Sequence, residues 1–174
     1  MKSTPYTINN LKPIFKGRLP GQLIIQYSNR CNADCPQCGM RRSNKIPRFT
    51  LDNEQVRQLI DNAAEKGVKS LSFTGGEPLL FLDDIVKLIS YASDAGIPYI
   101  RTGTNGYMFR NSDRPDFRQR IETIAEKLAS TDLYNFWISL DSAVPADHEE
   151  MRGLSGVVRG IEKALPIFHS YDIY

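Results

Sequence analysis

The sequence lacks the features of a membrane-spanning or exported protein. No stretch of its 174 residues approaches the roughly 18 consecutive apolar residues of a membrane-spanning helix. Residues 1–20 carry four basic side chains but no continuous apolar segment, so they do not resemble a signal peptide. We therefore expect a cytoplasmic protein that has no membrane partner.

A strong net charge is missing too. The formal net charge is +2, from 22 basic and 20 acidic residues. This balance argues against nucleic acid or a membrane surface as the main partner. The hydrophobic fraction of 41% and the charged fraction of 24% are those of an ordinary globular protein. A chain of this length suggests one domain.

Cysteine is scarce but tightly grouped, because Cys31, Cys35 and Cys38 are the only three in the chain. An odd number at such short spacing makes a poor disulfide framework and, in a reducing compartment, predicts a metal site. Three thiolates on one loop could bind three irons of a cubane cluster and leave the fourth iron open. Zinc remains an alternative, although it usually takes four ligands and His148 and His169 lie far downstream. Three unrelated buried thiols are the remaining interpretation.

Strand and helix patterns alternate along the rest of the chain. Four apolar runs predict strands at 23–27, 70–74, 99–102 and 136–140. Apolar residues at helical spacing predict helices within 56–64, 85–92, 117–128 and 157–165. Such alternation is typical of a parallel sheet with crossover helices.

Individual residues predict where these elements begin and end. Asp52 is a candidate N-cap for the first helix, and Gly67 and Gly96 are candidate stops for the first and second. Pro166 should end or kink the fourth helix, because proline removes a backbone donor. Residues 171–174 look like the start of a fifth strand.

The predicted fold class is α/β: a partial (β/α) TIM-like barrel of parallel strands, with about four βα units and a truncation before the fifth strand. We divide the chain into an N-terminal arm, residues 1–20, and the N-terminal portion of a core domain, residues 21–174. Four units do not close a barrel, and an open parallel sheet leaves an unprotected edge. We therefore expect either part of a longer enzyme or a natural short form whose edge another subunit covers.

Two motifs carry a resemblance to a known family. The segment CNADCPQC, residues 31–38, resembles the CxxxCxxC signature of radical S-adenosylmethionine (SAM) enzymes, and residues 75–78 resemble that family's GGEP motif. The resemblance extends from Leu23 onward, so residues 21–174 would be the N-terminal portion of a radical SAM core. It is closest to the SPASM group, although no additional cysteine cluster is present. Gln37 departs from the pattern, because the family commonly has an aromatic residue there.

The resemblance implies two cofactors and a reaction. Cys31, Cys35 and Cys38 would hold a 4Fe–4S cluster whose open iron binds SAM. Reductive cleavage of SAM would give a 5′-deoxyadenosyl radical, which would abstract hydrogen from an unidentified substrate, either a peptide or a small molecule. The competing hypothesis is a binding module stabilised by zinc or a structural iron–sulfur cluster, without SAM chemistry.

The resemblance also implies a set of SAM-binding residues. The GGEP segment, formed by Gly75, Gly76, Glu77 and Pro78, would accept a hydrogen bond from the methionyl amine, with the glutamate supporting it. The alternative is an ordinary strand-to-helix turn.

Two later segments also follow predicted strands and resemble family motifs. Thr104 and Asn105 would contact SAM or shape its pocket, unless they only form an Asn-Gly turn. Ser139 would contact the ribose or the methionyl group. Asp141, two residues later, is a candidate cap for the next segment. These four positions all belong to segments at the expected carboxyl edge of the sheet.

A third pattern, H-x-x-x-R-G at 148–153, resembles a family stretch that opens the next helix. Arg152 within it would pair with the SAM carboxylate, because a guanidinium matches carboxylate geometry. The alternative is a surface ion pair with Glu149. His148 is more readily explained as structural than as a metal ligand.

A basic run follows the cysteines and consists of Arg41, Arg42, Lys45 and Arg48. Its simplest interpretation is a solvated loop. A functional interpretation is attraction of an acidic electron donor such as a flavodoxin or ferredoxin. No aromatic residues interleave with it, so nucleic acid is not expected.

Overall fold

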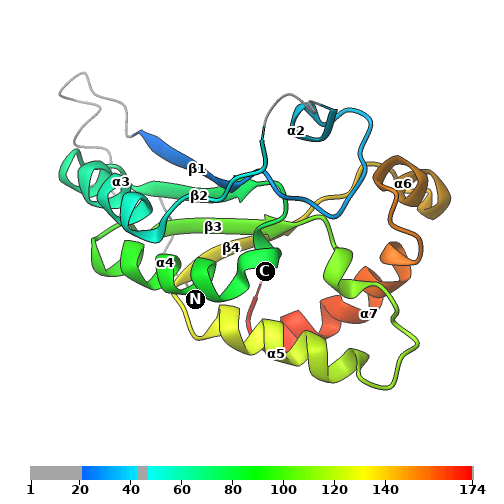
Figure 1. The fold of residues 1–174 in the computed structure, drawn as a ribbon. Coiled ribbons are helices and arrows are strands. Elements are labelled where there is room, and N and C mark those ends of the chain that lie inside the picture. Colours follow the sequence, from blue (N-terminus) through cyan, green and yellow to red (C-terminus); the bar gives the residue numbers. More distant parts are fainter. Residues whose placement is uncertain (1–20, 43–46, 174) are drawn as a thin grey trace.

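The computed structural model describes residues 21–42 and 47–173, so the predicted arm at 1–20 lies outside the described residues. Four strands form one sheet in the order β1-β2-β3-β4: Gln22–Ser28, Ser70–Gly75, Tyr99–Thr104 and Leu133–Ile138. All three neighbouring pairs are parallel. Because each right-handed crossover advances one strand in the same direction, the crossover helices lie on one face, as at the start of a barrel (Figure 1). The predicted fold class is confirmed.

Four longer helices pack on the outer face of this sheet (Figure 1). They are α3 (Asn53–Glu65), α4 (Leu82–Asp94), α5 (Phe117–Ala129) and α7 (Val157–Ser170). Four short helical segments lie at the carboxyl ends of the strands. They are α2 (Gly39–Arg42), α6 (Pro145–Arg152) and the 3₁₀ turns η1 (Pro78–Phe81) and η2 (Tyr107–Phe109). The hydrophobic core fills the space between the sheet and the longer helices.

The first long helix shows how local sequence produces these elements. Asp52 caps α3, because its carboxylate accepts hydrogen bonds from the backbone N–H groups of Glu54 and Gln55. Gly67 follows the helix with a φ of 79°, a left-handed conformation that glycine adopts without strain. Both predictions for this helix are confirmed.

Proline does not end α7 as the sequence predicted. The helix runs to Ser170 with Pro166 inside it. The missing N–H would have bonded the carbonyl of Glu162, which is exposed, so water can satisfy that group. The opposite side of the helix buries Ile161, Ala164 and Phe168, and this apolar packing outweighs the lost hydrogen bond.

The strand boundaries also differ from the predictions. β3 continues to Thr104, and β4 begins at Leu133 and ends at Ile138 rather than spanning 136–140. β4 stops there because its partner turns away after Thr104, and the last contact is the Ser139 N–H donating to the Thr104 carbonyl at 2.9 Å. Leu140 beyond it is exposed.

Two later segments were also predicted wrongly. Residues 171–173 do not begin a fifth strand: they form a turn in which Ile173 N–H bonds back to the Phe168 carbonyl, and residue 174 lies outside the described range. The H-x-x-x-R-G pattern does not open the following helix. It lies in a separate helix, α6, which ends at Arg152 and is followed by Gly153 in a left-handed conformation.

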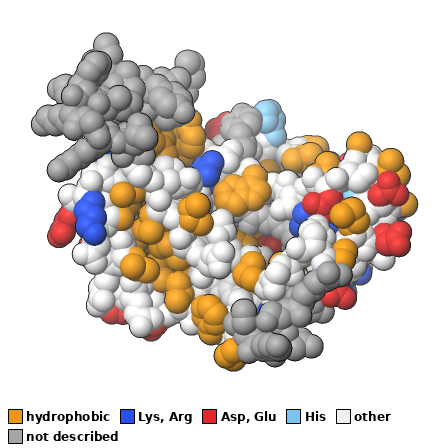
Figure 2. Space-filling view, turned by 90° about the horizontal axis from the view of Figure 1, so that it is seen from above, with side chains coloured by type: hydrophobic (Ala, Val, Ile, Leu, Met, Phe, Trp, Pro, Cys, Tyr) orange, Lys and Arg blue, Asp and Glu red, His pale blue; other side chains and the backbone are white. Residues whose placement is uncertain are grey.

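The inner face of the sheet is partly open. Gln22, Ile24 and Gln26 of β1 are exposed and alternate with buried or half-buried neighbours, and Ile24 is 59% exposed. In the view from above, hydrophobic side chains gather over the middle of the face and acidic ones lie towards its edge (Figure 2). No helix in the described part of the chain is long and apolar enough to cross a membrane.

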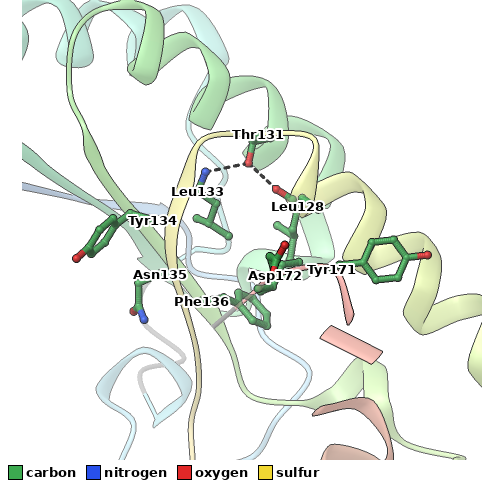
Figure 3. A pocket seen from close by; sticks show the side chains of 10 residues that line it. Leu128, Thr131, Leu133, Tyr134, Asn135, Phe136, Tyr171 and Asp172 are labelled. Carbon is green, nitrogen blue, oxygen red and sulfur yellow. Dashed lines mark hydrogen bonds between the residues drawn. The ribbon is translucent and has the colours of Figure 1, made fainter. Parts of the chain in front are cut away.

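A cavity of about 240 Å³ lies beside the start of β4, between that strand and the turn after α7 (Figure 3). The hydroxyl of Thr131 closes one side, donating to the Leu128 carbonyl at 2.7 Å and accepting from the Leu133 N–H at 3.2 Å. No cysteine or histidine lines it. It lies at the amino end of the strand, away from the cysteine loop.

Candidate functional site

A second cavity, of about 260 Å³, lies at the carboxyl ends of the strands. Every site residue predicted from the sequence lines it: Cys31, Cys35, Cys38, Gly75, Gly76, Glu77, Pro78, Thr104, Asn105, Ser139 and Arg152. These residues come from five separate segments of the chain. The fold brings them together because parallel strands place all their carboxyl ends at one edge.

The cysteine loop presents three free, partly exposed thiols to this cavity. A tight turn between the second and third is closed by the Cys38 N–H donating to the Cys35 carbonyl at 3.1 Å. Cys31 Sγ accepts from the Ala33 N–H at 3.4 Å. Burial raises the pKa of the Cys35 thiol, and the positive charge of Arg152 opposes that rise. A bound metal would deprotonate such a thiol outright.

The paired glycines let the end of β2 lie directly against the cysteine loop. The Gly76 N–H donates to the Ser28 carbonyl at 2.7 Å, and the Glu77 N–H donates to the Arg30 carbonyl at 2.9 Å. A Cβ on Gly76 would lie 1.8 Å from the Arg30 oxygen, and Gly75 has a φ of 125°. Only glycine fits both positions, because the contact is between two backbones.

Glu77 is a buried carboxylate that ties three segments together. One oxygen accepts from the Thr104 hydroxyl at 2.7 Å and the Leu79 N–H at 3.0 Å, and the other accepts from the Asn105 N–H at 2.7 Å. Burial raises its pKa, and these three hydrogen bonds oppose the rise. The glutamate therefore holds the turn after β2 to the end of β3 rather than offering a free oxygen to the cavity.

The polar groups of Thr104 and Asn105 are likewise engaged within the protein. The Thr104 hydroxyl bonds Glu77 and accepts from the Gly106 N–H at 3.0 Å. The Asn105 amide nitrogen donates to Cys31 Sγ at 3.4 Å and to the Asn32 side-chain oxygen at 2.9 Å. The segment is thus both a turn and a support for the cysteine loop.

Arg152 reaches the cavity from the end of α6. Its guanidinium makes a bidentate ion pair with Asp141, at 2.7 and 2.8 Å, and its side chain is 12% exposed. Its own carbonyl accepts from the Asp34 N–H at 2.8 Å, which fastens α6 to the cysteine loop. The alternative pairing of Arg152 with Glu149 is wrong, and so is the cap assigned to Asp141.

Glu149 has a different role, because it caps α7. Its carboxylate accepts from the backbone N–H groups of Gly156 at 2.8 Å and Val158 at 3.1 Å. An acidic group is favoured at a helix N-terminus, where unpaired N–H groups carry partial positive charge. Nearby His148 is fully buried, and its Nδ1 accepts from the Asp141 N–H at 3.1 Å, which fits the predicted structural role.

Trp137 is a wall of the cavity that sequence analysis did not single out. It lies on β4 directly beside Gly103 of β3, and a Cβ on that glycine would lie 2.4 Å from the indole ring. The signal was present in the sequence, because Trp137 precedes Ser139 by two residues and so shares its side of the strand. Gln37 also lines the cavity.

The donor set fits a cubane cluster with one open iron. Three thiols and no histidine line the cavity, and two N–H groups already point at Cys31 Sγ. Within residues 21–42 and 47–173, no three His, Cys, Asp or Glu side chains are placed to hold a single metal ion. A cubane cluster does not require the three thiolates to converge on one ion, because each thiolate binds a different iron.

Comparison with protein families decides the assignment. The model of the radical SAM superfamily matches residues 25–173 of this chain. The chain belongs to the radical SAM superfamily. The cofactors of this family are a 4Fe–4S cluster and SAM, and the binding module without SAM chemistry is not favoured. The family model does not distinguish the SPASM group, which stays a prediction.

Curated relatives agree with the family. A probable GTP 3′,8-cyclase of Sulfolobus acidocaldarius is 32% identical over 151 residues, covering 85% of this chain and 44% of the relative. The AdoMet-dependent heme synthase of Methanosarcina barkeri is 29% identical over 153 residues, covering 88% and 40%. The chain therefore spans less than half the length of these radical SAM relatives.

Solved structures share the fold. The structure described as native anSMEcpe with bound AdoMet has a TM-score of 0.61 and 20% identity, covering 87% of this chain and 41% of that one. Streptococcus suis SuiB bound to S-adenosylmethionine gives a TM-score of 0.62 and 20% identity, covering 91% and 35%. Both likenesses concern the radical SAM fold alone.

The basic run after the cysteines is only partly visible. The side chains of residues 41–46 lie outside the described part of the structure. The Arg48 guanidinium donates to the carbonyls of Asn29 at 3.0 Å and Met40 at 2.8 Å. This arginine therefore braces the loop that carries the cysteines.

Proposed function

We propose that the protein initiates radical chemistry by reductive cleavage of SAM in the cavity at the carboxyl ends of its strands. When bound, the cluster and SAM supply a one-electron cleavage of the sulfonium bond that yields methionine and a 5′-deoxyadenosyl radical, which takes a hydrogen atom from a substrate. The observation that carries the proposal is the convergence of three thiols, a glycine turn and a partly buried arginine on one cavity.

The residues of this chain would hold the cofactors in complementary ways. Cys31, Cys35 and Cys38 would bind three irons. The backbone of Gly75 and Gly76 would accept the methionyl amine, and Pro78 would fix the turn that presents it. This interpretation is supported by the close backbone approach of the glycines to the cysteine loop, and by the cavity that the glycines and the thiols line together.

Arg152 would bind the SAM carboxylate. Asp141 orients its guanidinium through Nε and Nη2, and Nη1 has no hydrogen-bond partner within the described residues. Ser139 would contact the ribose or methionyl group from the same rim. Thr104, Asn105 and Glu77 would shape the pocket rather than touch SAM, since their polar atoms already bond one another and Cys31.

The domain assignment and the partners complete the proposal. Residues 21–174 would be the N-terminal portion of a radical SAM core, preceded by an arm at 1–20. An electron donor such as a flavodoxin or ferredoxin would reduce the cluster in the cytoplasm, where thiols stay free. The names of the two relatives given above describe different reactions, so neither reaction is transferred to this chain.

The test is anaerobic reconstitution of the protein as its gene encodes it. We expect about four irons and four sulfides per chain. With dithionite as reductant, SAM should give 5′-deoxyadenosine and methionine in equal amounts. Cys35→Ala should lose the cluster and the product, while Ser142→Ala, outside the cavity, should keep both. A single zinc per chain, or full cluster loading without SAM cleavage, would contradict the proposal.

A further inference from the structure

Arg101 is a charged residue on the inner face of the sheet that the proposed chemistry does not use. It lies on β3 two positions before Gly103, so both residues face the same side of the strand. Gly103 lines the cavity, whereas Thr102 between them is fully buried towards the helices. The row across the sheet at this level consists of Ile24, Ser72, Arg101 and Asn135. The other residues of this row are uncharged.

The side chain of Arg101 is held in place by its neighbours. Nε donates to the Ser72 hydroxyl oxygen at 3.1 Å, and that oxygen also accepts from the Gln22 amide at 2.7 Å. The guanidinium carbon lies 5.8 Å from the centre of the Trp137 ring. Trp137 is also a wall of the cavity, so the guanidinium is fixed next to that wall.

The positive charge of Arg101 has no counter-ion among the Asp and Glu side chains, all of which belong to the described residues. All 20 Asp and Glu residues of the sequence lie within the described ranges, because residues 1–20 and 43–46 contain neither. None of these carboxylates is within 4.0 Å of the guanidinium, and its Nη1 and Nη2 donate to no group in the described part of the chain. A partly buried cation with no paired carboxylate favours an anion beside it, because partial burial strengthens the attraction between opposite charges.

We propose that Arg101 binds an anionic group, carboxylate or phosphate, of the substrate. This inference rests on the proposed function, since a hydrogen-abstracting radical formed in the cavity requires the substrate to lie beside it. A substrate against Trp137 extends from the cavity along the inner face of the sheet and meets the guanidinium. Nε of Arg101 already donates to Ser72, so the two terminal nitrogens remain to donate paired hydrogen bonds to the oxygens of a carboxylate or phosphate.

The test measures binding of simple probes by calorimetry at fixed ionic strength, on the protein as its gene encodes it, loaded with its cluster. Acetate and inorganic phosphate probe the two anion classes, and acetamide is the neutral match for acetate. The variants are Arg101→Gln and Arg101→Lys. The control is Arg57→Gln, because Arg57 is also partly buried over an aromatic ring, 5.1 Å from the centre of Tyr91, but on the outer helices.

We expect wild type and Arg57→Gln to bind at least one anion, with at least tenfold weaker binding in Arg101→Gln and an intermediate loss in Arg101→Lys. Preference for phosphate identifies a phosphorylated substrate, and preference for acetate identifies a carboxylate substrate. Equal binding by wild type and Arg101→Gln, equal binding of acetamide, or no anion binding by wild type overturns the inference. SAM cleavage is assayed separately in each variant, so failure of the proposed function is seen independently of anion binding.

Discussion

The side-chain amide of Asn105 donates to Cys31 Sγ across 3.4 Å, joining the end of β3 to the loop that carries the thiols. The same amide bonds Asn32 at 2.9 Å, and the Asn105 backbone N–H bonds Glu77. One residue therefore touches both motifs that mark the family. A substitution of Asn105 should therefore change the properties of the cluster itself.

Asn105→Ala should lower the reduction potential of the cluster. A hydrogen bond to a cluster thiolate stabilises the more negative, reduced state, so its loss favours the oxidised state. The measurement is a redox titration followed by electron paramagnetic resonance, without SAM. Asn62→Ala is the control, because this asparagine lies on the exposed surface of α3 and bonds only the Gln58 carbonyl. An unchanged midpoint in Asn105→Ala would show that the contact does not tune the cluster.

Gly76→Ala should destabilise the fold by at least about 2 kcal/mol. Its new Cβ would lie 1.8 Å from the Arg30 carbonyl oxygen, and neither backbone can move without breaking the hydrogen bonds between them. Chemical denaturation of the protein measures the loss. In the matched variant Gly21→Ala, the new Cβ meets only Val68 at 3.8 Å, so stability should stay within about 0.5 kcal/mol of wild type. Similar values for the two variants would refute the steric argument.

Glu77→Gln should cost roughly 2–4 kcal/mol of stability, because a buried acceptor becomes a donor facing other donors. The three groups that bond Glu77 all donate, so one oxygen cannot be replaced by NH₂ without loss. Thermal or urea denaturation reports the change. Glu122→Gln removes a surface pair with Arg118 and should cost less than about 1 kcal/mol. If both substitutions reduce the stability by the same small amount, Glu77 does not hold the turn after β2 to the end of β3 as we describe.

Gly103→Ala should weaken SAM binding at least tenfold while leaving cluster content unchanged. The added methyl group would lie 2.4 Å from the Trp137 indole, and the ring would have to shift into the cavity. Equilibrium dialysis with labelled SAM measures the effect. In a Trp137→Phe background the smaller ring leaves room for the methyl group, so the penalty of Gly103→Ala should shrink. A penalty of the same size in both backgrounds would mean that the two residues do not interact.

Stability should fall as the pH drops from about 7 towards 5, through the titration of His148. Burial lowers the pKa of His148, and the positive charge of Arg152 lowers it further, while Asp141 and Glu149 oppose the shift. The pKa of His148 is therefore lower in the folded protein than in the unfolded chain. Neutral His148 contributes to the stability of the fold above its ordinary pKa of 6.5, and this stabilisation is lost as the pH falls through the folded pKa. Denaturation curves across this range measure it.

His148→Asn is the matched variant for this pH effect. Its side-chain oxygen can still accept from the Asp141 N–H, which bonds Nδ1 at 3.1 Å in the wild type, but it does not titrate. The difference in stability between wild type and this variant should therefore narrow or reverse as the pH falls. A difference that is constant with pH would show that His148 does not titrate in this range.

Much of the site could be predicted from spacing. Cys31, Cys35 and Cys38 are close in sequence, and Gly75 and Gly76 follow a strand, so both motifs were visible as patterns. The partner of Arg152 could not be predicted in this way. Whether it bonds Asp141 or Glu149 depends on how α6 turns against the cysteine loop, and no local pattern encodes that angle. The end of α7 was missed for a similar reason, because burial of Phe168 outweighs the local effect of Pro166.

The sequence alone determined the secondary-structure elements and the chemical groups at their ends. The periodicity of apolar residues predicted the strands and helices, and the residue types that follow the strands predicted thiols, glycines and acidic groups at the carboxyl edge of the sheet. These signals act over a few residues, where spacing decides which side chains share a face. Only the tertiary structure decided which polar groups bond one another and which stay available. Glu77 and Asn105 bond each other although they are 28 residues apart, whereas Arg101 has no Asp or Glu partner among the described residues. Both outcomes depend on packing between distant segments.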